Sequence, residues 1–475
     1  MHLMIFLRRI SPRTDGPPRL NERVPSGSHC AGTNAAPGYA KPVRCEPRWR
    51  AAEPSLQQAV SRLTTLIEQT EPTRQRRRRP ADAANFHRAV ECIACNILAV
   101  SLAAPDRPLA VPLANSASRL VPIFGKPARK VIDLMIAQGL VTKVRGYPYR
   151  GPTTIRATPE LGKHLPLGAA KWAALRLEDH AAVVVLKPRA SEEPDGDGGT
   201  QAPARPRSAA TSRWLPTITE QMHEINVAIL NAPIECKGSA VAHVAERPGG
   251  AMASLVTLHH RALRRIFNGS YEEGGRLFGG FWQTMPRPDR FKHIRISGEP
   301  IAICDYSQLF LRLAYAEAGV TPPAGDLYAI SSEETSKPGW KRLREARKKL
   351  VNAMFFAKAP LKQWPGASLE EIGEMRGAFP AGTKPRDAVR AIKERHTPIA
   401  HLFEQGHGLR FMRVESDLIV TVTLALLQRG IVALPIHDAV AVRRSDAETA
   451  RAIMQDEARR STSAGIPVGI QTSGW

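Results

Sequence analysis

The stretch PIAICDYSQLFLRLAYAEAG, residues 300–319, contains an apolar run that ends at a single carboxylate, Asp305. The run predicts a buried strand, and residues 307–319 have the apolar spacing of a helix, with Leu309 and Leu313 facing inward. Asp305 therefore lies at the carboxyl end of a strand, where open sheets tend to place ligands. Because a half-buried acid is costly unless it is paired or binds a metal, we expect a partner for Asp305 elsewhere in the chain.

A second strand-and-acid unit lies far downstream, in GIVALPIHDAVAVRR, residues 430–444. The runs IVALPI and AVAV are typical of two strands, and the tight turn between them carries His437 and Asp438. Two acids at strand ends in one sheet could hold a pair of Mg²⁺ ions. That arrangement suits phosphoryl transfer, in which one ion activates the attacking oxygen and the other stabilises the leaving pyrophosphate.

A basic helix is predicted between these two acids, in KRLREARKKLVNAMFFA, residues 341–357. Arg344, Lys348, Asn352 and Phe356 are spaced by four residues, so they share one face of the helix. Cations one turn apart can grip a triphosphate, and an aromatic side chain farther along can stack on a base.

Taken in their order along the chain, these three segments resemble motifs A, B and C of family A DNA polymerases, the class of DNA polymerase I. DYSQLFLR is similar to the motif A form DYSQIELR, the RxxxKxxxNxxxF helix to RxxxKxxxFxxxY, and IHDAVAV to VHDEIVL. Upstream, GGRLFGGFWQTMP is similar to the TGR…LQNIP segment, with Arg276, Gln283 and Pro286 in matching order. GDLY occupies the place of a GxDIH-like element. The resemblance covers about residues 270–445.

The resemblance implies an α+β fold: a palm with an antiparallel sheet and small helical fingers. It implies a DNA-directed DNA polymerase that uses two Mg²⁺ ions, a DNA primer-template and dNTPs. The implied catalytic and metal-binding residues are Asp305 and Asp438, with the backbone of Tyr306 assisting one ion. The implied nucleotide-binding residues are Arg344, Lys348, Phe310, Asn352 and Phe356. The residues implied to face or support the primer-template site are Arg276, Gln283, Arg312 and His437.

Several positions depart from the family pattern. Phe310 replaces the motif A glutamate that abuts the sugar, which leaves the preference between dNTPs and NTPs open. Asn352 and Phe356 replace the usual aromatic residue and tyrosine of motif B. Ala439 follows Asp438 where the family has an acid, and Glu415 or Asp417 is a candidate substitute. No segment has the acid-rich pattern of a proofreading exonuclease, so we expect none.

The composition of the chain favours a polyanionic partner. The 475 residues carry a formal net charge of +23, and this length predicts two or three domains. Six scattered cysteines show no disulfide framework, and the CxxC at Cys92 and Cys95 has no second half for a zinc site. No apolar run reaches the roughly 20 residues that span a bilayer. We therefore expect a cytoplasmic protein that does not act at a membrane.

The chain divides by composition into four parts. Residues 1–80 are basic and Pro-rich and predict disorder, apart from a short helix around LQQAVSRLTTLIEQ. Residues 82–186 predict a small globular domain, and residues 187–212 a linker. Residues 213–475 carry the polymerase-like motifs and predict the catalytic domain.

The small domain contains a basic helix followed by two strand-like pieces. In GKPARKVIDLMIAQGLV, residues 125–141, the helix is expected to bury Ile132, Met135 and Ile136 and to stop at Gly139. Helix, strand, basic turn and strand resemble the second half of a winged helix-turn-helix domain, which implies nucleic-acid binding. The residues that would make those contacts are Lys126, Arg129, Lys130 and Arg145. The alternative is a helical domain with a hairpin that binds protein or no partner.

Three other functions remain open at this point. An RNA- or primer-synthesising polymerase is compatible with Phe310. A DNA-binding regulator with an inactive polymerase-like domain is compatible with the missing acid after Asp438. An HD-type phosphohydrolase is disfavoured, because His437 and Asp438 lie in a predicted hairpin and the further metal ligands of that class are not evident. The reduced length of the polymerase-like region suggests a phage or mobile-element source.

Overall fold

The computed structural model describes residues 40–72, 78–146, 151–180, 182–188, 215–246 and 250–473. These residues form a mixed α+β protein whose strands make four sheets. The predicted disorder of residues 1–39 and most of the predicted linker lie outside the described residues.

The N-terminal body contains four helices: α1 (Pro54–Gln69), α2 (Pro80–Ala103), α3 (Ala117–Leu120) and α4 (Lys126–Ala137). Helix α2 is its central element, and a continuous run of its side chains, from Cys92 to Val100, is buried. By length and composition alone α2 could cross a membrane, but 67% of its apolar window is buried inside the protein, as in the core helix of a soluble domain.

The expected disorder up to residue 80 is wrong for residues 43–55, whereas the short helix expected around LQQAVSRLTTLIEQ is present as α1. Strands β1 (Val43–Arg44) and β2 (Trp49–Ala51) precede α1 there. Helix α1 buries Leu56, Leu63 and Ile67 in the same core as α2. The two strands, of two and three residues, are too short for an alternating pattern to predict them.

Two sheets cross the boundary that the sequence suggested between the small domain and the catalytic domain. One has the order β4 (Val141–Val144), β5 (Thr154–Ala157), β3 (Leu109–Ala110), β1, β10 (Ala253–Thr257) and β9 (Ala242–Glu246). The other has the order β12 (Ser270–Phe278), β11 (Arg264–Asn268) and β7 (Val184–Lys187). Strands β9 and β10 thus join the N-terminal sheet, and β7 pairs in parallel with β11. A division at residues 187–212 therefore does not separate two independent cores.

The predicted helix and hairpin of the N-terminal body are present as α4, β4 and β5. Helix α4 ends before Gly139, which adopts a left-handed φ of 66°. Ile132 and Met135 are fully buried, whereas Ile136 is 37% exposed, and Ala128 and Val131 complete the buried face instead.

An antiparallel sheet holds the C-terminal body together. Its order is β15 (Leu434–Ile436), β16 (Ala439–Arg443), β14 (Glu299–Tyr306), β13 (Ile294–Ile296) and β8 (Ile234–Cys236), and β17 (Val468–Gln471) also pairs with β14. Side chains of β14 alternate between two cores: Cys304 and Tyr306 lie in one, and Ile301 and Ile303 in the other. Asp305 follows the alternation of Ile301 and Ile303.

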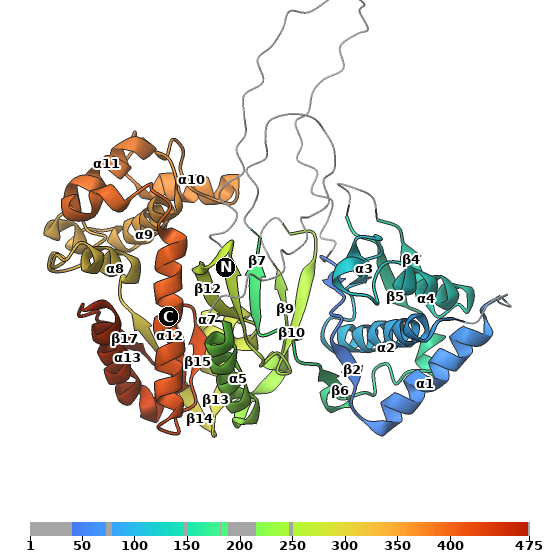
Figure 1. Ribbon diagram of the computed structural model, residues 1–475. Coiled ribbons are helices and arrows are strands. Elements are labelled where there is room, and N and C mark those ends of the chain that lie inside the picture. Colours follow the sequence, from blue (N-terminus) through green and yellow to red (C-terminus); the bar gives the residue numbers. More distant parts are fainter. Residues whose placement is uncertain are drawn as a thin grey trace, which may run out of the picture.

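Helices cover this sheet and extend beyond it. Helices α8 (Leu309–Glu317) and α13 (Ala447–Thr462) share the core of Cys304, and α12 (Gly408–Leu427) packs along β12. The remaining helices and strands are α5 (Leu215–Asn231), α6 (Phe281–Thr284), α7 (Arg287–His293), α9 (Trp340–Phe356), α10 (Leu369–Ala378), α11 (Pro385–Arg395) and β6 (Leu175–Leu177), which pairs with β2. Figure 1 shows α8–α13 gathered on one side, α1–α4 on the other, and β7, β9, β10 and β12 between them.

Candidate active site

Strand pairing brings the two predicted acids to neighbouring positions. Asp305 is paired with Ala439 of β16 on one side and with Gly469 of β17 on the other. The backbone N–H of Tyr306 donates to the carbonyl of Asp438 at 3.2 Å. His437 and Asp438 form the two-residue turn between β15 and β16, with a left-handed φ of 55° at His437. The hairpin expected from the sequence is therefore present, and it ends beside the end of β14.

The carboxylate of Asp305 forms no ion pair with any residue that the structure describes. Its Oδ1 is buried and accepts no hydrogen bond from any residue that the structure describes. Burial raises the pKa of Asp305 to about 8, and the negative charge of Asp438 adds to this shift. Lys348 and Arg287 act in the opposite direction but do not cancel it. An acid in this position favours either a proton or a cation that is absent from the polypeptide.

The surroundings of Asp305 leave room for such a cation. Residues paired directly across strands point to the same face of a sheet, and the two residues beside Asp305 are the small Ala439 and Gly469. A Cβ built on Gly469 would meet no atom within 4 Å. Among the described residues no group of three or more His, Cys, Asp or Glu side chains is placed to hold a metal. Two carboxylates fit Mg²⁺, which commonly takes one or two from the protein and fills its shell with water and phosphate oxygens.

Arg276 and Glu415 form a buried ion pair next to the two acids. Arg276 Nε and Nη2 donate to the two carboxylate oxygens of Glu415 at 2.5 and 2.6 Å, and the Glu415 side chain is 1% exposed. Burial disfavours the charge of Arg276, but Glu415 outweighs it and raises the pKa of Arg276. Glu415 is thus committed to Arg276 and is not available as a third metal-binding acid.

Asp417, the other suggested substitute acid, is committed in the same way. Its two oxygens accept from Arg265 at 2.5 Å and from Arg413 at 2.8 Å. Arg265 is itself buried and also donates to the carbonyl of Gly275 on β12. These contacts tie α12 to β11 and, through Arg265, to β12, and they occupy both oxygens of Asp417.

The predicted nucleotide-binding residues of α9 lie on its partly exposed face, as their spacing required. Lys348 is exposed, while Arg344, Asn352 and Phe356 are half-buried. Arg344 forms an ion pair of 2.5 Å with Asp326, in the segment between α8 and α9. The sequence placed Asp326 in the GDLY element but did not predict this pair, which joins residues 18 positions apart.

Phe310 lies in an aromatic cluster. Its ring is stacked on that of Phe356, with centroids 6.1 Å apart, and it also contacts Phe355 and Phe411. Phe310 is 9% exposed. The position that is a glutamate in family A polymerases is here part of an apolar surface shared with the motif B helix.

The residues expected to face or support the primer-template site are largely bound to the backbone of the protein. The side chain of Gln283 accepts from Gly279 and Gly280 and donates to the carbonyls of Leu277 and Pro435. Arg312 donates to the carbonyl of Ser307 and to Gln308. His437 differs, because its Nδ1 is buried without a described partner. Burial lowers the pKa of His437 to about 3, so the ring is neutral.

The cations of the N-terminal body are engaged within the chain. Arg129 donates to the carbonyl of Leu113 at 2.6 Å, and Lys130 lies 3.6 Å from Glu71. Lys143, on the neighbouring strand β4, pairs with Asp133 at 2.6 Å. The two other predicted contact residues, Lys126 and Arg145, are exposed. Residues 147–150 of the basic turn lie outside the described residues, so nucleic-acid binding by this region stays a prediction.

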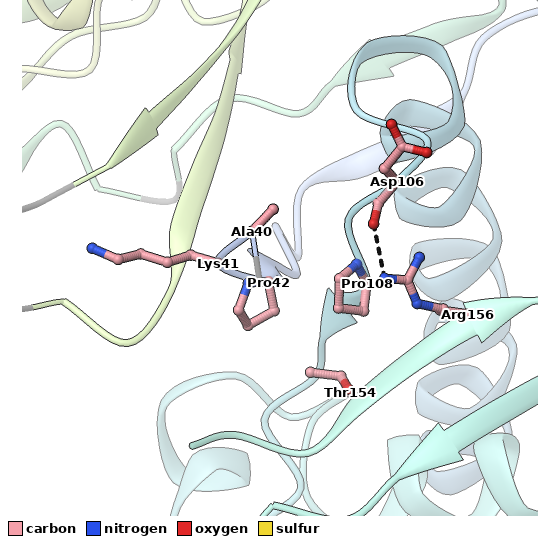
Figure 2. A pocket seen from close by; sticks show the side chains of 7 residues that line it. All are labelled: Ala40, Lys41, Pro42, Asp106, Pro108, Thr154 and Arg156. Atoms are coloured by element: carbon pink, nitrogen blue, oxygen red, sulfur yellow. Dashed lines mark hydrogen bonds between the residues drawn. The ribbon is translucent and has the colours of Figure 1, made fainter. Parts of the chain in front are cut away.

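Two further features of the N-terminal body lie apart from the acid pair. Cys92 and Cys95 are buried along α2, and the sulfur of Cys92 lies 3.7 Å from that of Cys45. A pocket of about 490 Å³ opens between the start of β1 and the strands β3 and β5. Figure 2 shows its lining, in which Arg156 donates to the main-chain carbonyl of Asp106 at 2.8 Å. Neither feature contains a pair of carboxylates.

Part of the chain is similar in structure to the POL domain of Pol1 from M. smegmatis, solved in complex with a DNA primer-template and dNTP. The sequence identity is 14%, the TM-score is 0.27, and the match covers 45% of this chain and 47% of that one. The chain thus spans about half the length of that protein. No protein-family model matches the chain, and no curated protein matches it.

Proposed function

We propose that this protein is a template-directed nucleotidyltransferase, a DNA-directed DNA polymerase that acts without a proofreading exonuclease. The observation that carries the proposal is the buried, unpartnered Oδ1 of Asp305 next to the turn that presents Asp438. The motif order of family A polymerases supports it, because the same two acids are the metal ligands that the resemblance implies. The antiparallel sheet around β14 would be the palm, and α9–α11 the fingers.

In this proposal Asp305, Asp438 and the backbone carbonyl of Tyr306 hold two Mg²⁺ ions. When bound, the ions would supply Lewis acidity for attack on the α-phosphate and for release of pyrophosphate. The chain itself binds the triphosphate through Lys348 and Arg344. The buried pair of Arg276 and Glu415 keeps the Arg276 cation beside Asp438, where it faces the growing strand.

The sugar preference is proposed to follow from Phe310. Its ring is packed against Phe356 and cannot accept a hydrogen bond from a hydroxyl group. A 2′-hydroxyl placed against these two rings would lose its hydrogen bonds to water, which is costly. We therefore propose dNTPs as substrates.

Primer extension in Mg²⁺, with dNTPs and NTPs supplied separately, tests this function. Wild type should extend the primer with dNTPs, and Asp305→Asn and Asp438→Asn should not. Asp446→Asn is a matched control, because Asp446 lies just beyond the opposite end of β16 and pairs with Arg443 at 2.7 Å. It should leave incorporation unchanged.

Three results would replace the proposal with an alternative. Extension with NTPs alone would indicate an RNA- or primer-synthesising enzyme. DNA binding that persists in Asp305→Ala, with no incorporation by wild type, would indicate a DNA-binding regulator. Full activity of Asp305→Asn would show that the acid pair is not the catalytic site.

A further inference from the structure

Arg344 is held by an acid of its own chain at the site proposed to bind a triphosphate. Its Nε donates to Asp326 Oδ2 at 2.5 Å, and its guanidinium lies 5.1 Å from the centre of the Tyr328 ring. The side chains of Arg344 and Asp326 are 30% and 20% exposed, so water and solutes reach the pair. Lys348, one turn along the same face of α9, makes no ion pair with any described residue.

Asp326 keeps its position without Arg344. Its Oδ1 accepts from the side chain of Gln308 at 2.8 Å and from the backbone N–H of Tyr328 at 2.9 Å. Gln308 in turn accepts from Arg312 at 3.2 Å. Arg344 therefore adds only the contact to Oδ2, and it can leave while the carboxylate stays in place.

The neighbouring ion pair of α9 differs from that of Arg344 in its contact geometry and in its burial. Arg347 donates to both oxygens of Glu334 at 2.5 and 2.9 Å, and its side chain is only 7% exposed. Glu334 also belongs to the segment between α8 and α9. A bidentate, buried pair of this kind is structural, because separating it would leave a buried charge uncompensated. Arg344 makes one contact to Asp326 and one to the exposed Glu345 at 3.3 Å, and such partly exposed contacts can be exchanged at low cost.

We propose that Asp326 competes with a polyphosphate for Arg344. Asp326 forms an ion pair with Arg344 until a polyphosphate binds to Arg344 and Lys348 and displaces it. This inference rests on the proposed function, since it assumes that Arg344 and Lys348 bind the nucleotide. A polyphosphate presents several negative oxygens to both cations at once, whereas Asp326 presents one charge to Arg344 alone. Asp326 is thus a positioning residue that weakens binding of any ligand with too few phosphates to displace it.

Titration of the full chain with inorganic tripolyphosphate in the presence of EDTA tests this role without metal or base. Asp326→Asn retains a side-chain oxygen for Gln308 and Tyr328 but removes the closer and less exposed of the two acids that pair with Arg344. Its affinity for tripolyphosphate should rise about two- to fivefold, the range expected for a partly exposed ion pair. A purely structural role would instead lower affinity together with the thermal midpoint.

Glu334→Gln is the matched control, because it removes an acid that pairs with the next arginine of α9. It should lower thermal stability and leave tripolyphosphate affinity unchanged. Equal affinity in wild type and Asp326→Asn would overturn the role of Asp326 and leave the phosphate site standing. Failure of every variant to bind tripolyphosphate would overturn both that role and the proposed nucleotide site.

Discussion

The N-terminal body and the end of β14 use their charges in opposite ways. In the N-terminal body, Lys130 and Lys143 each lie beside an acid of the same chain, Glu71 and Asp133. At the end of β14, the half-buried Asp305 lies next to another acid, and its buried Oδ1 has no described hydrogen-bond partner. Charges that are paired within the chain are accounted for by the stability of the fold and indicate no ligand. A charge that the fold buries without a partner points to something the fold is built to bind.

The largest effect is expected from Asp305→Asn and Asp438→Asn. Each should reduce Mg²⁺-dependent incorporation by about 10³-fold or more, because a bound metal supplies several kcal/mol of transition-state stabilisation. The folded protein should not be weakened, since Asp305→Asn removes repulsion between two acids. Incorporation rates and urea unfolding, measured on the same preparations, check both parts. A large loss of stability in Asp305→Asn would mean that the carboxylate is satisfied after all.

Glu415→Gln should act on stability. It leaves the guanidinium of Arg276 buried without a counter-charge, which typically costs about 3 kcal/mol or more. Urea unfolding of the purified variant measures this loss. Glu317→Gln is the comparison, because Glu317 and its partner Arg410 are 35% and 45% exposed and the loss of this pair should cost clearly less. Similar losses in the two variants would contradict the assignment of Glu415 to a buried structural pair.

The free energy of unfolding should depend on pH in a way that reflects the raised pKa of Asp305. Its pKa is about 8 in the folded protein, whereas an unfolded Asp titrates near about 3.9. The folded protein therefore retains a proton that the unfolded chain releases. This contribution is fully present at acid pH and is lost as the pH rises through the folded pKa. Between about pH 4 and 8, wild type should lose on the order of 1 kcal/mol or more relative to Asp305→Asn.

Urea unfolding at a series of pH values measures that difference. His437, whose lowered pKa gives the opposite slope in acid, is present in both proteins, so its effect should largely cancel. Mg²⁺ should reduce the difference near pH 8, because a cation favours the ionised carboxylate. A wild-type profile parallel to that of Asp305→Asn would contradict the raised pKa.

The smallest effect is expected in the N-terminal body. Asp133→Asn releases Lys143 from its acid. If this surface meets DNA, nonspecific affinity should rise, and the slope of log affinity against log salt should steepen by up to about 1. Fluorescence anisotropy with a duplex at several salt concentrations gives both quantities. An unchanged slope would place the DNA contact elsewhere and sharpen the contrast with the C-terminal body.

Local patterns predicted the elements around the acids. The apolar run before Asp305, the hairpin signal at His437 and Asp438, and the spacing in residues 341–357 correspond to β14, the β15–β16 turn and α9. Each signal is carried by fewer than twenty consecutive residues, so periodicity alone suffices to read it. The nearness of the two acids followed because both lie at ends of strands in one sheet.

The partners of the charged residues could not be predicted in this way. Arg276 and Glu415 are 139 positions apart, and nothing local to either residue indicates the other. The pairing of Val43 with Ala253 joins two short strands through one register position, which leaves no mark on either segment. Such long-range contacts depend on how the cores pack, which no local sequence pattern encodes.

The exchange of β7, β9 and β10 between the two halves has a practical consequence for dissecting the protein. A cut in residues 189–214 would strip β1 of β10 and β11 of β7, and each fragment would expose a bare strand edge to other chains. Each fragment expressed alone should aggregate, whereas the two fragments produced in the same cell could reassemble into the folded protein. Neither half is thus expected to fold independently, so neither could be fused to another protein as a separate domain.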